Sequence, residues 1–200
     1  MQPFMMIKNL YEYFLKDTGL MTYPASDIGV FFKTNPNEKT PNAQIHFAPG
    51  AGEYKKNGAM RPSSGITASI CNLRPESRGH VELQSSDPSV APKIYANYLD
   101  KEKDIKSMIE GVNKIREVFK TPTMKNIGAT EIQPGSTYQT DNEIDSFIRN
   151  ESLSVYHPIG TCKMGNGTEC VVDQNLKVKG IESLRVADAS IFPSIISGNT

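Results

Sequence analysis

The sequence predicts an α+β fold in which helices cover an antiparallel sheet. Three features carry this prediction: several strand-like segments without a helix between them, one long amphipathic segment after them, and a final stretch that lacks periodicity. Strands that follow one another through short turns pair antiparallel, whereas parallel strands need a long crossover. We therefore expect an α+β domain over residues 1–150 and a separate strip over residues 151–200.

The first hundred residues contain one helix followed by strands. Apolar residues recur every three or four positions over residues 4–16, and Gly19 is placed to end that helix. Alternating or β-rich segments predict strands at residues 27–33, 43–48, 66–73, 80–84 and 93–99. We expect one antiparallel sheet of about five or six strands within residues 20–100.

A glycine-rich segment at residues 50–58 lies between two of these strands. It matches neither the dinucleotide-binding GxGxxG pattern nor a phosphate-binding loop of the Walker type. We interpret it as a flexible surface loop.

Two helices are predicted after residue 100. Residues 104–120 place seven apolar side chains on one face and charged ones opposite, and Pro122 marks the end. We expect this helix to cover one face of the sheet. A shorter helix begins at Thr140, where Thr140 and Glu143 have the spacing of a capping box.

Composition limits the classes of partner and site. Lys plus Arg equals Asp plus Glu at 22 each, so no basic excess favours a nucleic-acid partner. No apolar run approaches the roughly 20 residues of a membrane span, and the first residues do not have the pattern of a secretory signal. Localisation stays open, with a cytoplasmic or membrane-associated protein expected. Three cysteines and scattered histidines predict reduced thiols and no metal site.

His157 is the candidate catalytic residue of the strip. Pro158 follows it, and Val155, Tyr156 and Ile159 supply apolar neighbours that would favour a neutral imidazole. A neutral imidazole suits a base that takes a proton from an alcohol. By itself, a lone histidine is more often structural. A hydrolase that uses Cys162 with His157 is the weaker alternative, because no oxyanion-hole motif accompanies the pair.

Several segments resemble the glucose–methanol–choline (GMC) family of FAD-dependent oxidoreductases. They are YHPIGTCKMG from residue 156, VVD from 171, LKVKGIESLRVADAS from 176, FPSIISGNT from 192, and SRGHVEL from 77, followed by DP at 87 and NYL at 97. The resemblance spans nearly the whole chain and is strongest to choline-dehydrogenase-like alcohol dehydrogenases.

The resemblance implies roles for individual residues. His157 would accept the hydroxyl proton of an alcohol while hydride passes to FAD, and Asn199 would hydrogen-bond the substrate oxygen. It also implies FAD contacts from Asp188, Ala189 and Thr200, and substrate contacts from Val155 and Tyr156. Considered alone, Asp188 has the features of a turn-capping carboxylate.

The resemblance also implies that this chain is the C-terminal part of such an enzyme. The FAD-binding half, with its strand, GxGxxG turn and helix, would lie upstream, and residues 151–200 would return into it. The chain alone would then be inactive and bind FAD weakly or not at all. The alternative is a non-catalytic substrate-binding or cap module with the same fold. The alcohol, the electron acceptor and the oligomeric state stay open.

A geometric expectation follows from the two roles. His157 and Asn199 must reach one substrate oxygen, so their functional atoms should lie about 4–8 Å apart. Apolar surface around Val155, Ile159 and Ile191 should be exposed toward the implied partner domain.

Overall fold

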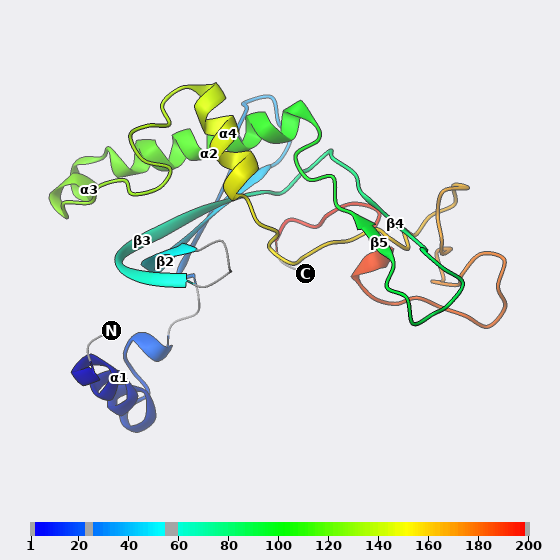
Figure 1. Ribbon diagram of the computed structural model, residues 1–200, viewed down its shortest axis with the longest axis horizontal. Helices are drawn as coiled ribbons and strands as arrows, with labels where there is room; N and C mark the ends of the chain where they lie inside the picture. The colour runs from blue at the N-terminus through cyan, green and yellow to red at the C-terminus, as the bar shows by residue number, and fades with distance from the viewer. Residues whose placement is uncertain (1–2, 23–25, 55–59, 199–200) are drawn as a thin grey trace.

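The computed structural model describes residues 3–22, 26–54 and 60–198. The helices are α1 (Pro3–Lys16), α2 (Glu102–Phe119), α3 (Pro122–Asn126) and α4 (Asp141–Glu151), with short 3-10 turns η1 (Leu20–Thr22) and η2 (Ala189–Ile191). The strands are β1 (Ile28–Phe32), β2 (Ala43–Tyr54), β3 (Met60–Asn72), β4 (His80–Glu82) and β5 (Lys93–Tyr95). The molecule is elongated, with a sheet and helices at one end and a long irregular strip at the other (Figure 1).

The main sheet has the order β1-β2-β3, and all its pairs are antiparallel, which confirms the predicted strand direction. β2 and β3 form a long hairpin that runs from the Ala43–Asn72 pair to the Tyr54–Met60 pair, with a bulge around Gly50. The interpretation of residues 50–58 as a loop is therefore wrong for residues 50–54, which continue β2. Cross-strand pairing with β3 overrides the weak strand preference of the glycines. Residues 55–58 of that segment lie outside the described residues.

The expectation of a single sheet of five or six strands is wrong. β4 and β5 pair only with each other, as a short antiparallel ribbon. The chain leaves the main sheet after Asn72, where the backbone N–H groups of Glu76 and Ser77 both donate to the Asp104 carboxylate, each at 2.9 Å. These two contacts fix the backbone between β3 and β4 to the first turn of α2, and Pro75 has no N–H to offer to a sheet ladder.

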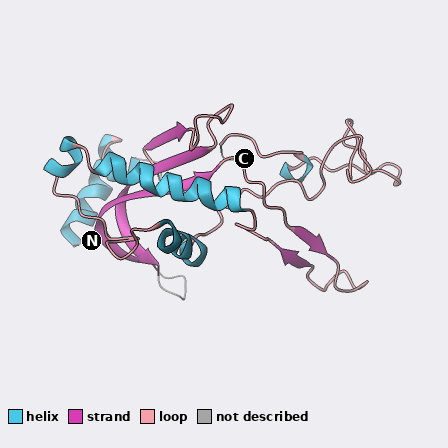
Figure 2. Ribbon diagram, turned by 90° about the horizontal axis from the view of Figure 1, so that it is seen from above, coloured by secondary structure: helices cyan, strands magenta, loops and turns pink. Residues whose placement is uncertain are grey.

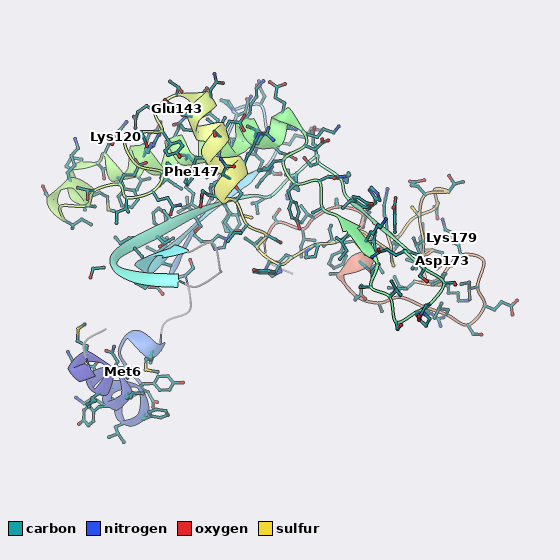
Figure 3. All side chains as sticks on the ribbon, viewed as in Figure 1. Met6, Lys120, Glu143, Phe147, Asp173 and Lys179 are labelled. Atoms are coloured by element: carbon teal, nitrogen blue, oxygen red, sulfur yellow. The ribbon has the colours of Figure 1, made fainter. Side chains whose placement is uncertain are left out.

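α2 covers one face of the main sheet, as predicted, and lies across the strands (Figure 2). The core lies between α2, α4 and β3 and consists of Ile105, Ile109, Val112, Ile144 and Ile148, with partly buried neighbours that include Phe147, which Figure 3 labels on α4. The approach of α2 to β3 is close at Gly111, because a Cβ there would lie 2.3 Å from Cγ1 of Ile70. A residue without a side chain thus sets the helix-to-sheet distance.

α4 begins with the predicted capping box. The Thr140 hydroxyl accepts from the Glu143 N–H at 3.3 Å, and the Glu143 carboxylate accepts from the Thr140 N–H at 2.8 Å. Pro122 does end α2, as predicted, but it is also the first residue of α3, a helix that the sequence pattern missed. Proline suits that position because the first N–H of a helix has no partner within it.

Much apolar surface is exposed. α1 contacts only η1 among the described elements, and Met6, which Figure 3 labels, is exposed, as are Ile7, Phe14 and Leu15. The chain exposes 14619 Å² in total, whereas a compact monomer of its 22.1 kDa exposes roughly 9,000 Å². Among the described residues, no helix combines the length and the hydropathy that crossing a membrane requires.

Candidate active site

His157 lies in the loop that follows α4. Its side chain is half-buried, and the residue before it, Tyr156, has a φ of +62°. A left-handed backbone costs a residue with a side chain roughly 1–2 kcal/mol. Ser154 supports this conformation, because its hydroxyl oxygen accepts the Tyr156 N–H at 3.0 Å. The backbone next to His157 is therefore held in a strained form, as is common at functional sites.

The segment after His157 is fixed against the segment that contains η2. The N–H of Cys162 donates to the Ser190 carbonyl at 3.0 Å, and the N–H of Met164 donates to the Ile191 carbonyl at 2.8 Å. Gly160, with a φ of +87°, allows the approach, because a Cβ there would lie 3.4 Å from the Phe192 carbonyl oxygen. Two segments thirty residues apart in the chain thus form one unit.

In the remainder of the strip, isolated β-bridges surround Val172, which is fully buried. Val172 bridges Met164 on one side and Val178 on the other, and Asp173 N–H donates to the Lys177 carbonyl at 2.9 Å. Figure 3 labels Asp173 and Lys179 in this outlying part of the strip. The strip therefore has a small core of its own.

Asp188 and Ala189 lie at the start of η2, beside the His157 loop. The Asp188 carboxylate accepts the Ser190 N–H at 2.8 Å, and its hydrogen bonds with Ser190 hold the pKa of Asp188 below its usual range. Asp188 is thus a turn-capping carboxylate, the role favoured for the residue alone. The Ala189 N–H has no hydrogen-bond partner among the described residues, so it is available as a donor.

The C-terminal end of the strip is held at the end of the main sheet. Arg74, two residues beyond β3, donates one hydrogen bond to the Leu73 carbonyl at 2.8 Å and one to the Ser197 hydroxyl. Asn199 and Thr200 follow directly but lie outside the described residues. The expected separation of His157 and Asn199 therefore stays a prediction, as does the FAD contact of Thr200.

The predicted substrate-contacting residues are accessible. Val155 is 50% exposed and Tyr156 85% exposed. The expectation that Ile159 and Ile191 would also be exposed is wrong, because both are half-buried where the two segments pair. The apolar surface next to His157 is therefore limited to the loop itself.

Sequence reasoning missed two residues that the structure places in notable settings. Arg74 stands outside every predicted element, and nothing in the sequence indicated that it contacts Ser197, 123 residues away. Gln44 is buried in β2 and its Oε1 atom has no partner among the described residues. The alternation Ala43-Gln44-Ile45 placed Gln44 on the face opposite Ile45, but burial of that face could not be seen in the pattern.

The described residues contain no group of three or more His, Cys, Asp or Glu side chains that could hold a metal ion. Cys71, Cys162 and Cys170 form no disulfide. Cys170 is buried, where its sulfur lies 2.7 Å from the position of a Cβ on Gly165. The three cysteines are therefore free thiols, of which Cys170 is buried and Cys71 and Cys162 are half-buried.

The comparisons with known proteins define the class. The family described as GMC oxidoreductase matches residues 75–200, which include the His157 loop and η2. The chain belongs to the GMC oxidoreductase family.

Two curated relatives match almost the whole chain. One is an alcohol dehydrogenase [acceptor] of Pseudomonas putida, 40% identical over 96% of this chain and 34% of its own length. The other is an oxygen-dependent choline dehydrogenase of Chromohalobacter salexigens, 38% identical over 94% of this chain and 34% of its own length. The chain thus spans about a third of the length of these relatives.

A solved structure agrees with the fold. An FAD-dependent oxidoreductase from Chaetomium thermophilum superimposes with a TM-score of 0.68 and 30% identity, over 82% of this chain and 26% of that one. The α+β fold is therefore that of the C-terminal, substrate-binding part of GMC oxidoreductases, and FAD is the family's cofactor.

Proposed function

We propose that the protein containing this chain oxidises the CH–OH group of an alcohol. The observation that best supports this proposal is that the His157 loop pairs with the segment containing η2. The imidazole of His157 is half-buried there, next to the strained backbone of Tyr156. The relatives named as alcohol and choline dehydrogenases support this assignment.

The proposed chemistry divides between this chain and its cofactor. The hydroxyl proton of the alcohol passes to an imidazole nitrogen of His157 as the C–O bond becomes a carbonyl. Asn199 supplies an amide N–H that donates to the same oxygen while negative charge develops there. FAD, when bound, takes up the hydride and thus both electrons. Val155 and Tyr156 would contact the substrate from the His157 loop.

The residues of η2 fit a group rich in oxygen acceptors and hydroxyl donors, as FAD is. The Ala189 N–H, which has no hydrogen-bond partner among the described residues, can donate to a phosphate or carbonyl oxygen, and the exposed Asp188 carboxylate can accept from a hydroxyl. Because η2 is paired with the His157 loop, a cofactor held there would lie near the base.

Anaerobic addition of primary alcohols to the full-length protein tests the proposal. We expect a yellow protein whose visible flavin absorption is bleached as the alcohol is oxidised and the flavin takes up the hydride. A yellow protein that no alcohol bleaches would favour the non-catalytic cap module. A colourless protein inactivated by thiol reagents would favour a hydrolase that uses Cys162.

A further inference from the structure

Two segments that contact each other contain much of the strained backbone of this chain. In the described part of the chain, six residues other than glycine have a positive φ, and three of them are Asn97, Leu99 and Tyr156. Asparagine tolerates a left-handed backbone, whereas leucine and tyrosine adopt it only where neighbouring contacts stabilise it. The contacts around Leu99 and Tyr156 therefore indicate what this part of the fold holds in place.

Asn97 and Leu99 fix the position of the residue between them. The Asn97 amide donates to the Arg78 carbonyl at 3.2 Å. The Leu99 side chain packs against the buried cluster of α2 and α4, and the Leu99 carbonyl accepts a hydrogen bond from Arg149 at 3.1 Å. Tyr98 is thus held from both sides, although its own side chain is 63% exposed. The direction of its side chain is set by the backbone and not by burial of the ring.

The Tyr98 hydroxyl reaches the loop that precedes His157. It donates to the Ser154 hydroxyl oxygen at 3.5 Å, from a residue 56 positions earlier in the chain. The same oxygen accepts the Tyr156 N–H at 3.0 Å. A hydroxyl oxygen has two lone pairs, so Ser154 can accept both hydrogen bonds at once. The two hydroxyls therefore connect the anchored segment Asn97–Leu99 to the left-handed Tyr156.

Tyr156 in turn determines where the imidazole of His157 lies. Its φ of +62° sets the direction in which the chain enters His157, and Pro158 restricts the backbone of His157 from the other side. A change of Tyr156 to an ordinary negative φ would displace the imidazole. Displacement of a catalytic group by about 1 Å can lower a rate by about 100-fold, so the contacts that hold Tyr156 matter for a proton transfer to His157.

We propose that Tyr98 and Ser154 are positioning residues for His157. Their hydroxyls keep Tyr156 in the left-handed conformation and so hold the imidazole in the position from which it accepts the hydroxyl proton of the alcohol. Neither hydroxyl touches the substrate or takes up the proton itself. This inference rests on the proposed alcohol oxidation.

Single-turnover flavin reduction separates positioning from substrate binding. The full-length, flavin-loaded protein is mixed anaerobically with increasing concentrations of the alcohol that reduces it fastest among ethanol, n-butanol, benzyl alcohol and ethylene glycol. Stopped-flow spectroscopy gives a limiting reduction rate and an apparent Kd. Ser154→Ala should lower the limiting rate by about 10- to 100-fold and Tyr98→Phe by about 3- to 10-fold, with the apparent Kd within about twofold of the wild-type value.

Rescue and coupling distinguish positioning from a general loss of stability. Ser154→Thr keeps the hydroxyl and should restore the limiting rate to within about threefold of the wild-type rate. Because Tyr98 acts through Ser154, adding Tyr98→Phe to Ser154→Ala should not slow the reduction further. Ser152→Ala and Tyr95→Phe are the matched controls and should keep the wild-type rate, since neither hydroxyl makes a hydrogen bond among the described residues.

The outcomes separate this inference from the proposed function. If an alcohol reduces the wild-type flavin but either Ser154→Ala or Tyr98→Phe keeps the wild-type rate, the inference is wrong while alcohol oxidation stands. Additive effects of the two changes, or a Ser154→Thr variant as slow as Ser154→Ala, also overturn it. If none of the alcohols reduces the flavin, both proposals fail. Should Ser154→Ala not load flavin, Tyr98→Phe, a change in an exposed side chain, decides alone.

Discussion

His157 occupies a loop whose conformation depends on its neighbours rather than on regular structure. Tyr156 adopts a left-handed backbone, Ser154 accepts its N–H, and Gly160 turns the chain toward Phe192. The sequence pattern shows the histidine but not this conformation, because part of it depends on the contact between Gly160 and Phe192, which are far apart in the sequence. The catalytic role of His157 was predicted from the resemblance to a known family, and the periodicity of the sequence gave no indication of it.

Removal of the imidazole should stop turnover without loss of the cofactor. In the full-length protein, His157→Ala should lower kcat for alcohol oxidation by about 10²- to 10⁴-fold, the usual effect of a positioned base. His80→Ala is the control, because His80 is exposed on the β4–β5 ribbon, stacked on Tyr95. Stopped-flow flavin reduction measures the effect, and flavin content should stay near that of the wild type. An unchanged kcat would remove His157 from the mechanism.

Asp104 is a buried carboxylate that accepts four hydrogen bonds. Burial by itself raises the pKa of this carboxyl, but hydrogen bonds from the Ser77 hydroxyl, two backbone N–H groups and the Asn72 amide outweigh it and lower the pKa. A carboxyl with a lowered folded-state pKa stabilises the fold above its unfolded pKa of about 3.9 and loses that contribution as the pH falls through the folded value.

In Asp104→Asn, an amide NH2 group replaces one carboxylate oxygen and faces the groups that donate to it. We expect this change to destabilise the segment around Glu76 and Ser77 by about 2–3 kcal/mol at pH 7. Hydrogen exchange at the amides of Glu76 and Ser77 reports it directly, since both N–H groups donate to Asp104. The difference from the wild type should shrink as the pH falls through the lowered folded-state pKa of Asp104, because the wild-type carboxyl is then protonated too. Glu102→Ala, an exposed change in the same turn, should leave these amides unaffected. Equal exchange in Asp104→Asn would contradict the assignment.

Among the elements, those with local signals were predictable and those set by distant contacts were not. The capping box at Thr140 and the apolar face of α2 depend on residues a few positions apart, so their sequence spacing sufficed. β4 and β5 were recognised as strands, but their own residues did not indicate that they pair with each other and not with the main sheet. The extension of β2 through Gly52 likewise depends on its partner β3.

The capping box gives a prediction at the element scale. Thr140→Ala removes the hydroxyl oxygen that accepts the Glu143 N–H and should destabilise α4 by about 1 kcal/mol. Faster hydrogen exchange at the Glu143 amide would show the loss. Thr137→Ala is the matched control, because Thr137 is exposed in the preceding loop and makes no hydrogen bond among the described residues. If both variants behave alike, the cap does not stabilise the helix.

For the whole molecule, the exposed area is the dominant observation. The chain exposes roughly 5,000 Å² more than a compact monomer of its mass, and among the described helices and strands α1 contacts only η1. An α+β core was predictable from periodicity, whereas the extent of uncovered surface was not, because it depends on how the elements are spaced. The division at residue 150 stays a prediction.

We expect the chain alone to bind FAD weakly or not at all, because only η2 and its neighbours offer contacts. Isothermal titration with FAD, compared with the flavin content of the full-length protein, measures this. In the full-length protein, the amides of α1 should also exchange more slowly than in the isolated chain, since further protein would cover Ile7 and Phe14. Tight FAD binding by the isolated chain would contradict the prediction.

The hydrogen bonds and close contacts described for the β4–β5 ribbon lie at its base. Asp104 holds Glu76 and Ser77, the Asn97 amide donates to the Arg78 carbonyl at 3.2 Å, and any side chain at Gly79 would meet the Tyr95 carbonyl oxygen. Beyond this base the ribbon contacts no other helix or strand in the described part of the chain. Closing a longer loop adds only about 0.6 kcal/mol for each doubling of its length. The tip around Ser86 is therefore the position at which evolution, or an engineer, can lengthen or replace the chain with least consequence for the core.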